Sequence, residues 1–252
     1  MRPVLVIGHR GTGVGEGENT LGGFADALRL GADGIELDVR RTADGALAVH
    51  HDATVPGLGP VAALRVRDLP GHIPLLEAAL DVCASGVVNV EVKNGPHEPG
   101  FDPDELAARE VATLLAGQAD RLAAGALIVS SFSPATLDAV VATSPEVPVG
   151  LLTIGAVDQE QALGLAVERG YSALHPHHEA VTAELAGAVH AAGLLLNTWT
   201  VNEAERAVWL ASCGVDAVIT DRVADVAAAV DALAPTGPGE ARGRPRREPP
   251  AP

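Results

Sequence analysis

The sequence is poor in aromatic residues, in cysteine and in positive charge. Phe, Trp and Tyr make up only 2% of the 252 residues, so the core must be built mainly from Ala, Val and Leu. Cys83 and Cys213 lie far apart in the sequence, so no disulfide framework is implied, which suits a reducing compartment. The net charge of −16 argues against nucleic acid or an anionic membrane as the main partner.

Long apolar runs are also missing. No stretch approaches the ~18 consecutive apolar residues of a membrane helix. The apolar run at the N-terminus is too short for a signal peptide and leads directly to His9. We therefore expect a cytoplasmic protein with no stable membrane insertion.

Lysine is nearly absent. Lys93 is the single lysine beside 16 arginines, whereas ordinary usage gives roughly 15 lysines in a chain of this length. The compact ammonium of lysine and the planar guanidinium of arginine are not interchangeable in a confined site. The one lysine of the chain therefore indicates a position where arginine does not serve.

Short strand-like runs alternate with amphipathic helical segments along most of the chain. The strand-like runs are Val4–Gly8, Gly34–Val39, Ala46–His51, Val87–Lys93, Leu127–Phe132, Val149–Thr153, Ala173–His175, Leu194–Thr200 and Ala217–Thr220. The helical segments are 20–31, 74–84, 103–123, 134–143, 158–169, 181–192, 203–213 and 222–233. This alternation predicts βα units around a parallel sheet.

The second and third runs are joined differently from the others. The turn-forming sequence TADG lies between them and no helix does, so we expect a hairpin whose second strand folds back outside the sheet. Without that return strand, eight βα strands remain, which predicts a (β/α)₈ TIM barrel. The barrel is expected to occupy residues 1–234. The remaining sequence, PTGPGEARGRPRREPPAP, has no apolar periodicity, so residues 235–252 are expected to form a disordered tail.

Acidic residues occupy inward-facing positions of two predicted strands. Glu36 and Asp38 lie two residues apart in GIELDVR, and Glu91 and Lys93 share that spacing in VVNVEVKN, so each pair faces one way. Buried carboxylates are unfavourable unless they are paired or bind a cation. Three of them suit one hard divalent cation, Mg²⁺ or Ca²⁺, whereas a salt bridge is the alternative for any single acid. Zinc would be indicated by Cys or by an HxH pair on the first strand, and neither is there.

Two histidines and an arginine complete the candidate site. His9 and Arg10 follow the first run, at the strand ends where barrel enzymes carry their active sites. If the hairpin turn is centred within residues 43–44, His51 lies opposite Glu36 and beside the cation. Two imidazoles can act as base and acid at neutral pH, while fixed cations neutralise a phosphate. The set is equipped to cleave a phosphodiester. We take His9 as the base and His51 as the acid, although the sequence leaves their order open.

Three further residues lie near predicted strand ends. His175 and His177, in LHPHHEAVT, are either metal ligands or polar residues of the barrel mouth. The second reading is favoured because amidohydrolase barrels that use such histidines carry an HxH pair on strand one. Trp199, in NTWTVN, either walls the substrate site or packs in the core.

The motifs GHRG with ENT, then ELDVR, HHD, VEVK and WTVN, resemble those of the glycerophosphodiester phosphodiesterase family, in family order, over roughly residues 5–221. The resemblance implies a (β/α)₈ barrel with one divalent cation. It implies hydrolysis of a small-molecule glycerophosphodiester to glycerol 3-phosphate and an alcohol, a step of lipid and glycerol metabolism.

Carried over by motif, the resemblance implies a role for each residue of the candidate site. It implies the catalytic pair His9 and His51, the metal ligands Glu36, Asp38 and Glu91, the phosphate-binding Arg10 and Lys93, the substrate-side ring Trp199 and a supporting acid, Glu18. Gly17 stands where the family usually has proline, and the segment after His51 is shorter than usual, which leaves the headgroup preference open.

Two other functions remain possible on the sequence. A lysophospholipase D-like or sphingomyelinase D-like phosphodiesterase would share the barrel and the histidine pair, but it would need an exposed apolar rim for an acyl chain. A non-catalytic barrel that only binds a phosphodiester would be expected to lack one of the histidines or acids, and none is missing here.

Overall fold

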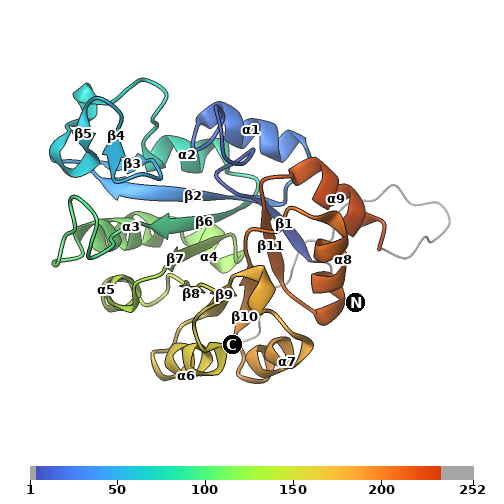
Figure 1. The fold of residues 1–252 in the computed structure, drawn as a ribbon. Helices are drawn as coiled ribbons and strands as arrows, with labels where there is room; N and C mark the ends of the chain where they lie inside the picture. The colour runs from blue at the N-terminus through green and yellow to red at the C-terminus, as the bar shows by residue number, and fades with distance from the viewer. Residues whose placement is uncertain (1–3, 234–252) are drawn as a thin grey trace.

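The computed structural model describes residues 4–233, which form a closed barrel of eight parallel strands with helices around it (Figure 1). Around the ring the strands are β1 (Leu5–Gly8), β11 (Ala217–Thr220), β10 (Leu195–Thr198), β9 (Ala173–Pro176), β8 (Val149–Thr153), β7 (Leu127–Ser131), β6 (Val87–Val92) and β2 (Gly34–Arg41). Pairing of β1 with both β11 and β2 closes the ring. The predicted (β/α)₈ barrel is confirmed. The predicted tail, residues 235–252, lies outside the described residues.

Helices connect successive strands of the ring, and the last helix follows the final strand. They are α1 (Leu21–Arg29), α2 (Leu76–Val82), α3 (Leu106–Ala116), α4 (Ala119–Ala123), α5 (Pro134–Thr143), α6 (Gln159–Glu168), α7 (Ala183–Ala191), α8 (Ala204–Cys213) and α9 (Val223–Asp231). The helix expected over 103–123 divides into α3 and α4, and Gly117 is the C-terminal cap of α3. No helix among residues 4–233 has the length and apolar character needed to cross a membrane.

The predicted hairpin is present, but its register differs from the expected one. β3 (Leu47–Val49) pairs antiparallel with β2 outside the ring, with Val39 opposite Val49. The placement of His51 opposite Glu36 is therefore wrong, because the pairing is shifted by one residue and ends at Val49. The cause is the turn: Gly45 adopts a positive φ of 87°, which adds a third loop residue between Thr42 and Ala46.

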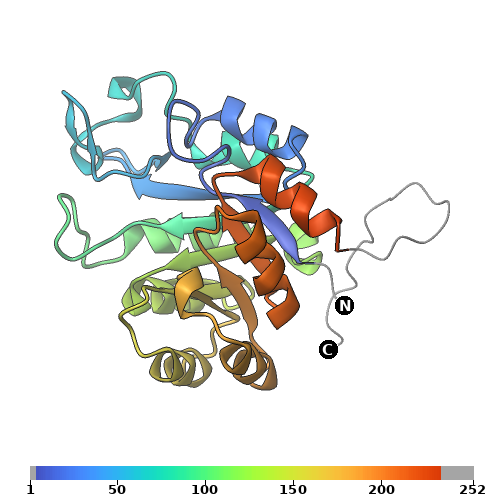
Figure 2. The ribbon, with the colours of Figure 1, turned by 45° about the vertical axis from the view of Figure 1, so that its right-hand side comes forward.

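The segment after β3 forms a small lobe beside the barrel. It contains a hairpin of β4 (Thr54–Val55) and β5 (Gly59–Pro60), followed by two 3₁₀ turns, Val61–Ala63 and Val66–Asp68. Its Val55, Val61 and Ile73 form a separate apolar cluster with Ala48 of β3. In both views this lobe stands next to the arrowhead end of β2 (Figure 1, Figure 2). The lobe therefore borders the end of the barrel where the site residues lie.

On β2, alternation separates an apolar outer face from an acidic inner face. On β2, Ile35, Leu37 and Val39 are fully buried in the main core between strands and helices. Glu36 and Asp38 take the intervening positions and point into the barrel. This pattern places carboxylates inside a closed sheet, where only paired or bound charges are stable.

Candidate active site

The predicted site residues gather around one pocket at the C-terminal ends of the strands. The pocket has a volume of about 310 Å³, in the range of small-molecule sites. It is lined by His9, Arg10, Glu36, His51, Asn89, Glu91, Lys93, Phe132, Leu152, Trp199, Thr200 and Ile219. Of the predicted catalytic, substrate-binding and metal-binding residues, Asp38 is the one absent from this lining, because it is buried against Lys93 and Arg10.

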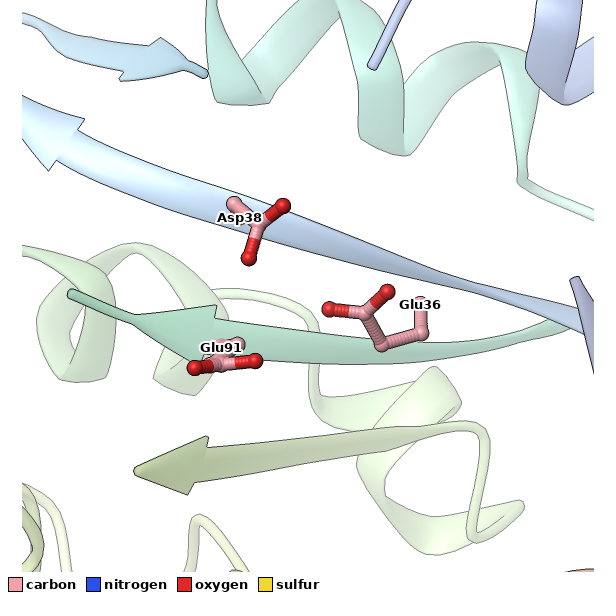
Figure 3. A group of neighbouring side chains, drawn as sticks. All are labelled: Glu36, Asp38 and Glu91. Atoms are coloured by element: carbon pink, nitrogen blue, oxygen red, sulfur yellow. The ribbon is translucent and has the colours of Figure 1, made fainter. Parts of the chain in front are cut away.

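Three carboxylates converge at the base of this site. Glu36 and Asp38 on β2 and Glu91 on the adjacent strand β6 turn toward one another (Figure 3). Each offers an oxygen, and these oxygens lie within 4.8 Å of one another. Glu36 Oε1 is buried without a hydrogen-bond partner, a costly arrangement unless something binds that oxygen. The set fits a hard divalent cation, which prefers oxygen ligands.

Burial and neighbouring charges shift the pKa values of the three carboxylates in both directions. Burial, reinforced by the charge of Asp38, raises the pKa of Glu36 to about 8. Burial also raises the pKa of Glu91, although Lys93 opposes it. For Asp38 burial acts in the same sense, but Lys93, His51 and Arg10 outweigh it and lower the pKa. A cation bound by the three acids would therefore displace protons as it binds.

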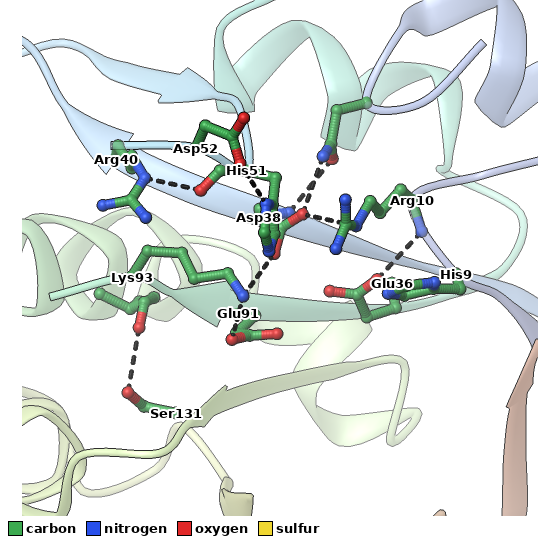
Figure 4. Close-up of polar contacts among 12 residues, drawn as sticks. His9, Arg10, Glu36, Asp38, Arg40, His51, Asp52, Glu91, Lys93 and Ser131 are labelled. Carbon is green, nitrogen blue, oxygen red and sulfur yellow. Dashed lines mark hydrogen bonds and ion pairs between the residues drawn. The ribbon is translucent and has the colours of Figure 1, made fainter. Parts of the chain in front are cut away.

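Lys93 and Arg10 are the two fixed cations of the pocket (Figure 4). The Lys93 ammonium lies 2.5 Å from Glu91 Oε1 and 3.1 Å from Asp38 Oδ1. Arg10 Nε lies 3.3 Å from Asp38 Oδ2, and the Arg10 backbone N–H donates to Glu36 Oε2 at 3.0 Å. Burial would lower the pKa of Lys93, but Glu91 and Asp38 raise it, so the ammonium stays charged.

The loop after β1 is shaped to hold these groups. Asn19 and Asp38 bond reciprocally: the Asn19 amide donates to Asp38 Oδ2 at 2.8 Å, and the Asp38 N–H donates to Asn19 Oδ1 at 3.2 Å. Glu18 lies 3.4 Å from Arg10 Nη1, the supporting position expected from the sequence. At Gly13, φ is +93° and a Cβ would meet Asp221 Cβ at 2.6 Å, so only glycine allows this approach.

His9 is held by the last strand of the barrel. Its Nδ1 lies 2.6 Å from Asp221 Oδ1, and its Nε2 lies 3.9 Å from Glu36 Oε2. Asp221 is itself held by the Asn202 amide, which donates to Asp221 Oδ2 at 2.8 Å. Burial lowers the pKa of His9, but the Asp221 hydrogen bond and the charge of Glu36 together raise it above its ordinary value.

His51 reaches the same pocket from beyond the end of β3. Its Nδ1 lies 2.7 Å from Asp52 Oδ1, and its ring faces the Asp38–Lys93 side of the pocket (Figure 4). Burial lowers the pKa of His51, as do Lys93 and Arg10, while Asp38 and Asp52 oppose the change. His51 therefore lies beside the acids, as predicted, although the predicted strand register is wrong.

Aromatic rings form the opposite wall of the pocket. Trp199 packs edge-to-face against Phe132 and against His177, with ring centroids 5.4 and 5.3 Å apart. The Trp199 indole donates to the carbonyl of His175 at 2.8 Å, which fixes the ring. Trp199 thus lines the pocket and also packs against the apolar cluster of Ile7, Ala217 and Ile219, so it combines the two readings of the sequence.

The two histidines considered as metal ligands take no part in the acidic cluster. His175 is fully buried in the barrel, its Nε2 accepts from the Asn197 amide at 2.9 Å, and burial lowers its pKa to about 3. His177 stands at the mouth against Trp199. Within residues 4–233, Glu36, Asp38 and Glu91 are the group of potential ligands close enough to share an ion.

Sequence reasoning missed several residues that hold the site. Asp221 follows the last strand directly, so the strand-end rule applied to every strand would have found it. Asp52 belongs to the HHD motif, but of that motif only His51 was assigned a role. Asn89 precedes Glu91 by two positions and therefore shares its face; both polar atoms of its buried amide lack a hydrogen-bond partner. No signal in the sequence pointed to the contacts of Arg40.

Comparisons with known proteins identify the family of this chain. A sequence model of the Glycerophosphoryl diester phosphodiesterase family matches residues 9–225. A glycerophosphodiester phosphodiesterase of Caldanaerobacter subterraneus is 32% identical over 86% of this chain and 93% of its own. One from Bacillus altitudinis is 31% identical over 86% and 94%.

Solved structures show the same fold. A putative glycerophosphoryl diester phosphodiesterase from Silicibacter pomeroyi has a TM-score of 0.77 at 26% identity, covering 92% of this chain and 94% of its own. A phosphodiesterase from Oleispira antarctica, solved with the product sn-glycerol-3-phosphate, has a TM-score of 0.77 at 23% identity, covering 91% and 97%. The chain therefore belongs to the glycerophosphoryl diester phosphodiesterase family and is a phosphoric diester hydrolase.

Proposed function

We propose that this protein hydrolyses glycerophosphodiesters to glycerol 3-phosphate and an alcohol, with one divalent cation and two catalytic histidines. The observation that supports the proposal is that two imidazoles and two fixed cations line one pocket, together with Glu36 and Glu91, and that Asp38 completes the acidic cluster beneath it. A phosphodiester needs its negative charge neutralised and protons moved on both sides of the phosphorus. The pocket offers groups for each task.

Glu36, Asp38 and Glu91 would hold the cation, Mg²⁺ or Ca²⁺. When bound, it would neutralise charge that develops on the phosphate oxygens. Arg10 and Lys93 lie beside these acids and add fixed positive charge for the same oxygens. The Arg10 guanidinium can grip two oxygens at once, whereas Lys93 acts as a point charge.

His9 and His51 would exchange protons with the attacking and leaving oxygens. The raised pKa of His9 favours its protonated form, and the lowered pKa of His51 favours its neutral form. These directions support His9 as the acid and His51 as the base, the reverse of the order first taken from the sequence. Asp221 contributes most to raising the pKa of His9. It forms a hydrogen bond with Nδ1 of the ring, which leaves Nε2 available to the substrate.

The aromatic wall would take the organic part of the substrate. Trp199 and Phe132 line the pocket, together with Leu152 and Ile219. An apolar or quaternary-ammonium group packs well on such rings. We accordingly choose glycerophosphocholine as the first substrate to test.

The test is the release of glycerol 3-phosphate and choline from glycerophosphocholine, with Mg²⁺ or Ca²⁺ added. We expect both products in equal amounts. Binding of glycerophosphocholine without product release under every metal tested would instead support the non-catalytic barrel, and would refute the proposed hydrolysis.

One observation favours a second candidate substrate, a lysophospholipid. Exposed apolar side chains follow several strands at the barrel mouth: Val14 after β1, Phe132 after β7 and Ile154 after β8. Such side chains could receive an acyl chain. Faster turnover of lysophosphatidylcholine than of glycerophosphocholine would identify this chain as the lysophospholipase D-like type.

Lys93→Arg is expected to lower kcat/KM at least tenfold, or about 1.4 kcal/mol, while the fold is kept. The ammonium fits between Asp38 and Glu91 at 3.1 and 2.5 Å, where the larger planar guanidinium would push the two acids apart. Steady-state kinetics with matched melting temperatures measure the effect. If Lys93→Arg is as active as the wild type while Lys93→Ala is inactive, only the charge matters and this account of the single lysine is wrong.

A further inference from the structure

Arg40 makes contacts that place it outside the pocket but directly behind a catalytic candidate. It lies on β2 two residues after Asp38, and its side chain is only 8% exposed. Its Nε donates to the backbone carbonyl of His51 at 2.8 Å (Figure 4). Its two terminal nitrogens donate to both oxygens of Glu98, at 2.9 and 3.1 Å.

We propose that Arg40 is a positioning residue, which holds the backbone of His51 to the loop after β6 and thereby aims the His51 imidazole at the substrate. The inference rests on the proposed catalytic role of His51. Arg40 is not a lining residue of the 310 Å³ pocket, and its guanidinium is directed at His51 and Glu98. It therefore acts through His51 rather than on the substrate.

His51 needs such a support because the regular sheet ends before it. The last paired residue of β3 is Val49, and the backbone bond that follows runs from His50 N–H to Asp38 O at 2.9 Å. The side-chain partner of the imidazole, Asp52, is 70% exposed and so is a weak anchor. The bond from Arg40 to the His51 carbonyl is partly buried and charge-assisted, which makes it stronger and more directional.

The two terminal nitrogens of the Arg40 guanidinium are held by Glu98, in the loop after β6. The bidentate pair with Glu98 lowers the pKa of that carboxyl, so the pair remains ionised. The Gly95 N–H donates to Glu98 Oε2 at 3.1 Å, and Asn94 and Asp102 bond reciprocally at 2.8 and 2.9 Å across the same loop. This loop follows Glu91 and Lys93 directly, so Arg40 ties the position of His51 to the strand that carries a metal ligand.

The neighbouring residue supplies a matched control. Arg41 also pairs with a glutamate, with Arg41 Nε 2.8 Å from Glu110 Oε2 on α3, but it is 30% exposed and outside the pocket lining. Arg41→Met removes a similar ion pair from the same strand without touching His51. Any general effect of losing an arginine on β2 should appear in both variants.

The kinetic experiment compares Arg40→Met, Arg41→Met and the wild type on glycerophosphocholine. Arg40→Met should lose between about tenfold and a hundredfold in kcat with little change in KM, since a misplaced catalytic group slows the chemical step. Arg41→Met should retain wild-type kcat. In the background of His51→Ala, the Arg40→Met change should cost nothing further. An additive loss in that double variant, or equal kcat in the two single variants, would overturn the proposal.

A second readout does not depend on substrate. The NMR signals of the His51 ring should shift or broaden in Arg40→Met, while those of His9 stay in place, and neither should change in Arg41→Met. A His51 signal that coincides with the wild type refutes the positioning role. If the wild-type enzyme itself releases no glycerol 3-phosphate, the proposed function fails. The NMR comparison still tests whether Arg40 positions the His51 ring.

Discussion

His9→Ala should lower kcat/KM on glycerophosphocholine by about 10²–10⁴-fold, the usual effect of removing a general acid or base. As the proposed acid, His9 protonates the leaving oxygen. Its loss should therefore matter much less for a glycerophosphodiester of 4-nitrophenol, whose alcohol leaves readily without a proton. His51→Ala, which removes the proposed base, should lower the rate on both substrates. Steady-state kinetics of the four combinations measure the effect.

The pH dependence gives an independent check on the same assignment. With a raised pKa, His9 stays protonated to higher pH, so its deprotonation should set the alkaline limb of the rate profile, and His51 should set the acidic limb. Asp221→Asn keeps the size of the side chain and removes its charge. It should move the alkaline limb to lower pH. If instead His51→Ala is the variant rescued by the nitrophenol substrate, the order first taken from the sequence is the correct one.

Chelation should abolish turnover, and Glu36→Gln or Glu91→Gln should weaken the binding of the divalent cation roughly a hundredfold or more. Losing an outer-shell partner of a metal typically costs about 10–100-fold, and these carboxylates would touch the ion itself. Affinity should rise with pH, because Glu36, with a pKa of about 8, must lose its proton to bind a cation. Calorimetric titration with Mg²⁺ and Ca²⁺ measures both effects.

Glu110→Gln is the matched control for the metal experiment. Glu110 pairs with Arg41 on the outer side of β2 and does not line the pocket, so its loss should leave cation affinity unchanged. Full activity in excess chelator, with metal-free protein verified by elemental analysis, would contradict the metal-dependent mechanism. Unchanged cation affinity in Glu36→Gln would place the ion elsewhere.

Much of the barrel and of the acidic site was predictable because those features are periodic and local. Alternation of strand-like runs and helices predicted the eight-stranded ring, and the lack of a helix after β2 predicted the outlying strand β3. Two-residue spacing put Glu36 with Asp38, and Glu91 with Lys93, on shared faces. The strand-end rule then brought both pairs and His9 to one mouth.

What the sequence alone determined is thus the fold and the set of chemical groups at the barrel mouth. Only the tertiary structure decided how those groups are held. Closure of the ring brings Asp221 to His9 across 212 residues of chain, and the conformation at Gly45 shifts the hairpin register by one residue. The Arg40–Glu98 pair joins β2 to the loop after β6, across 58 residues of chain. Residue periodicity describes one strand at a time, whereas these contacts depend on which strands become neighbours and on the φ angle of a single turn residue.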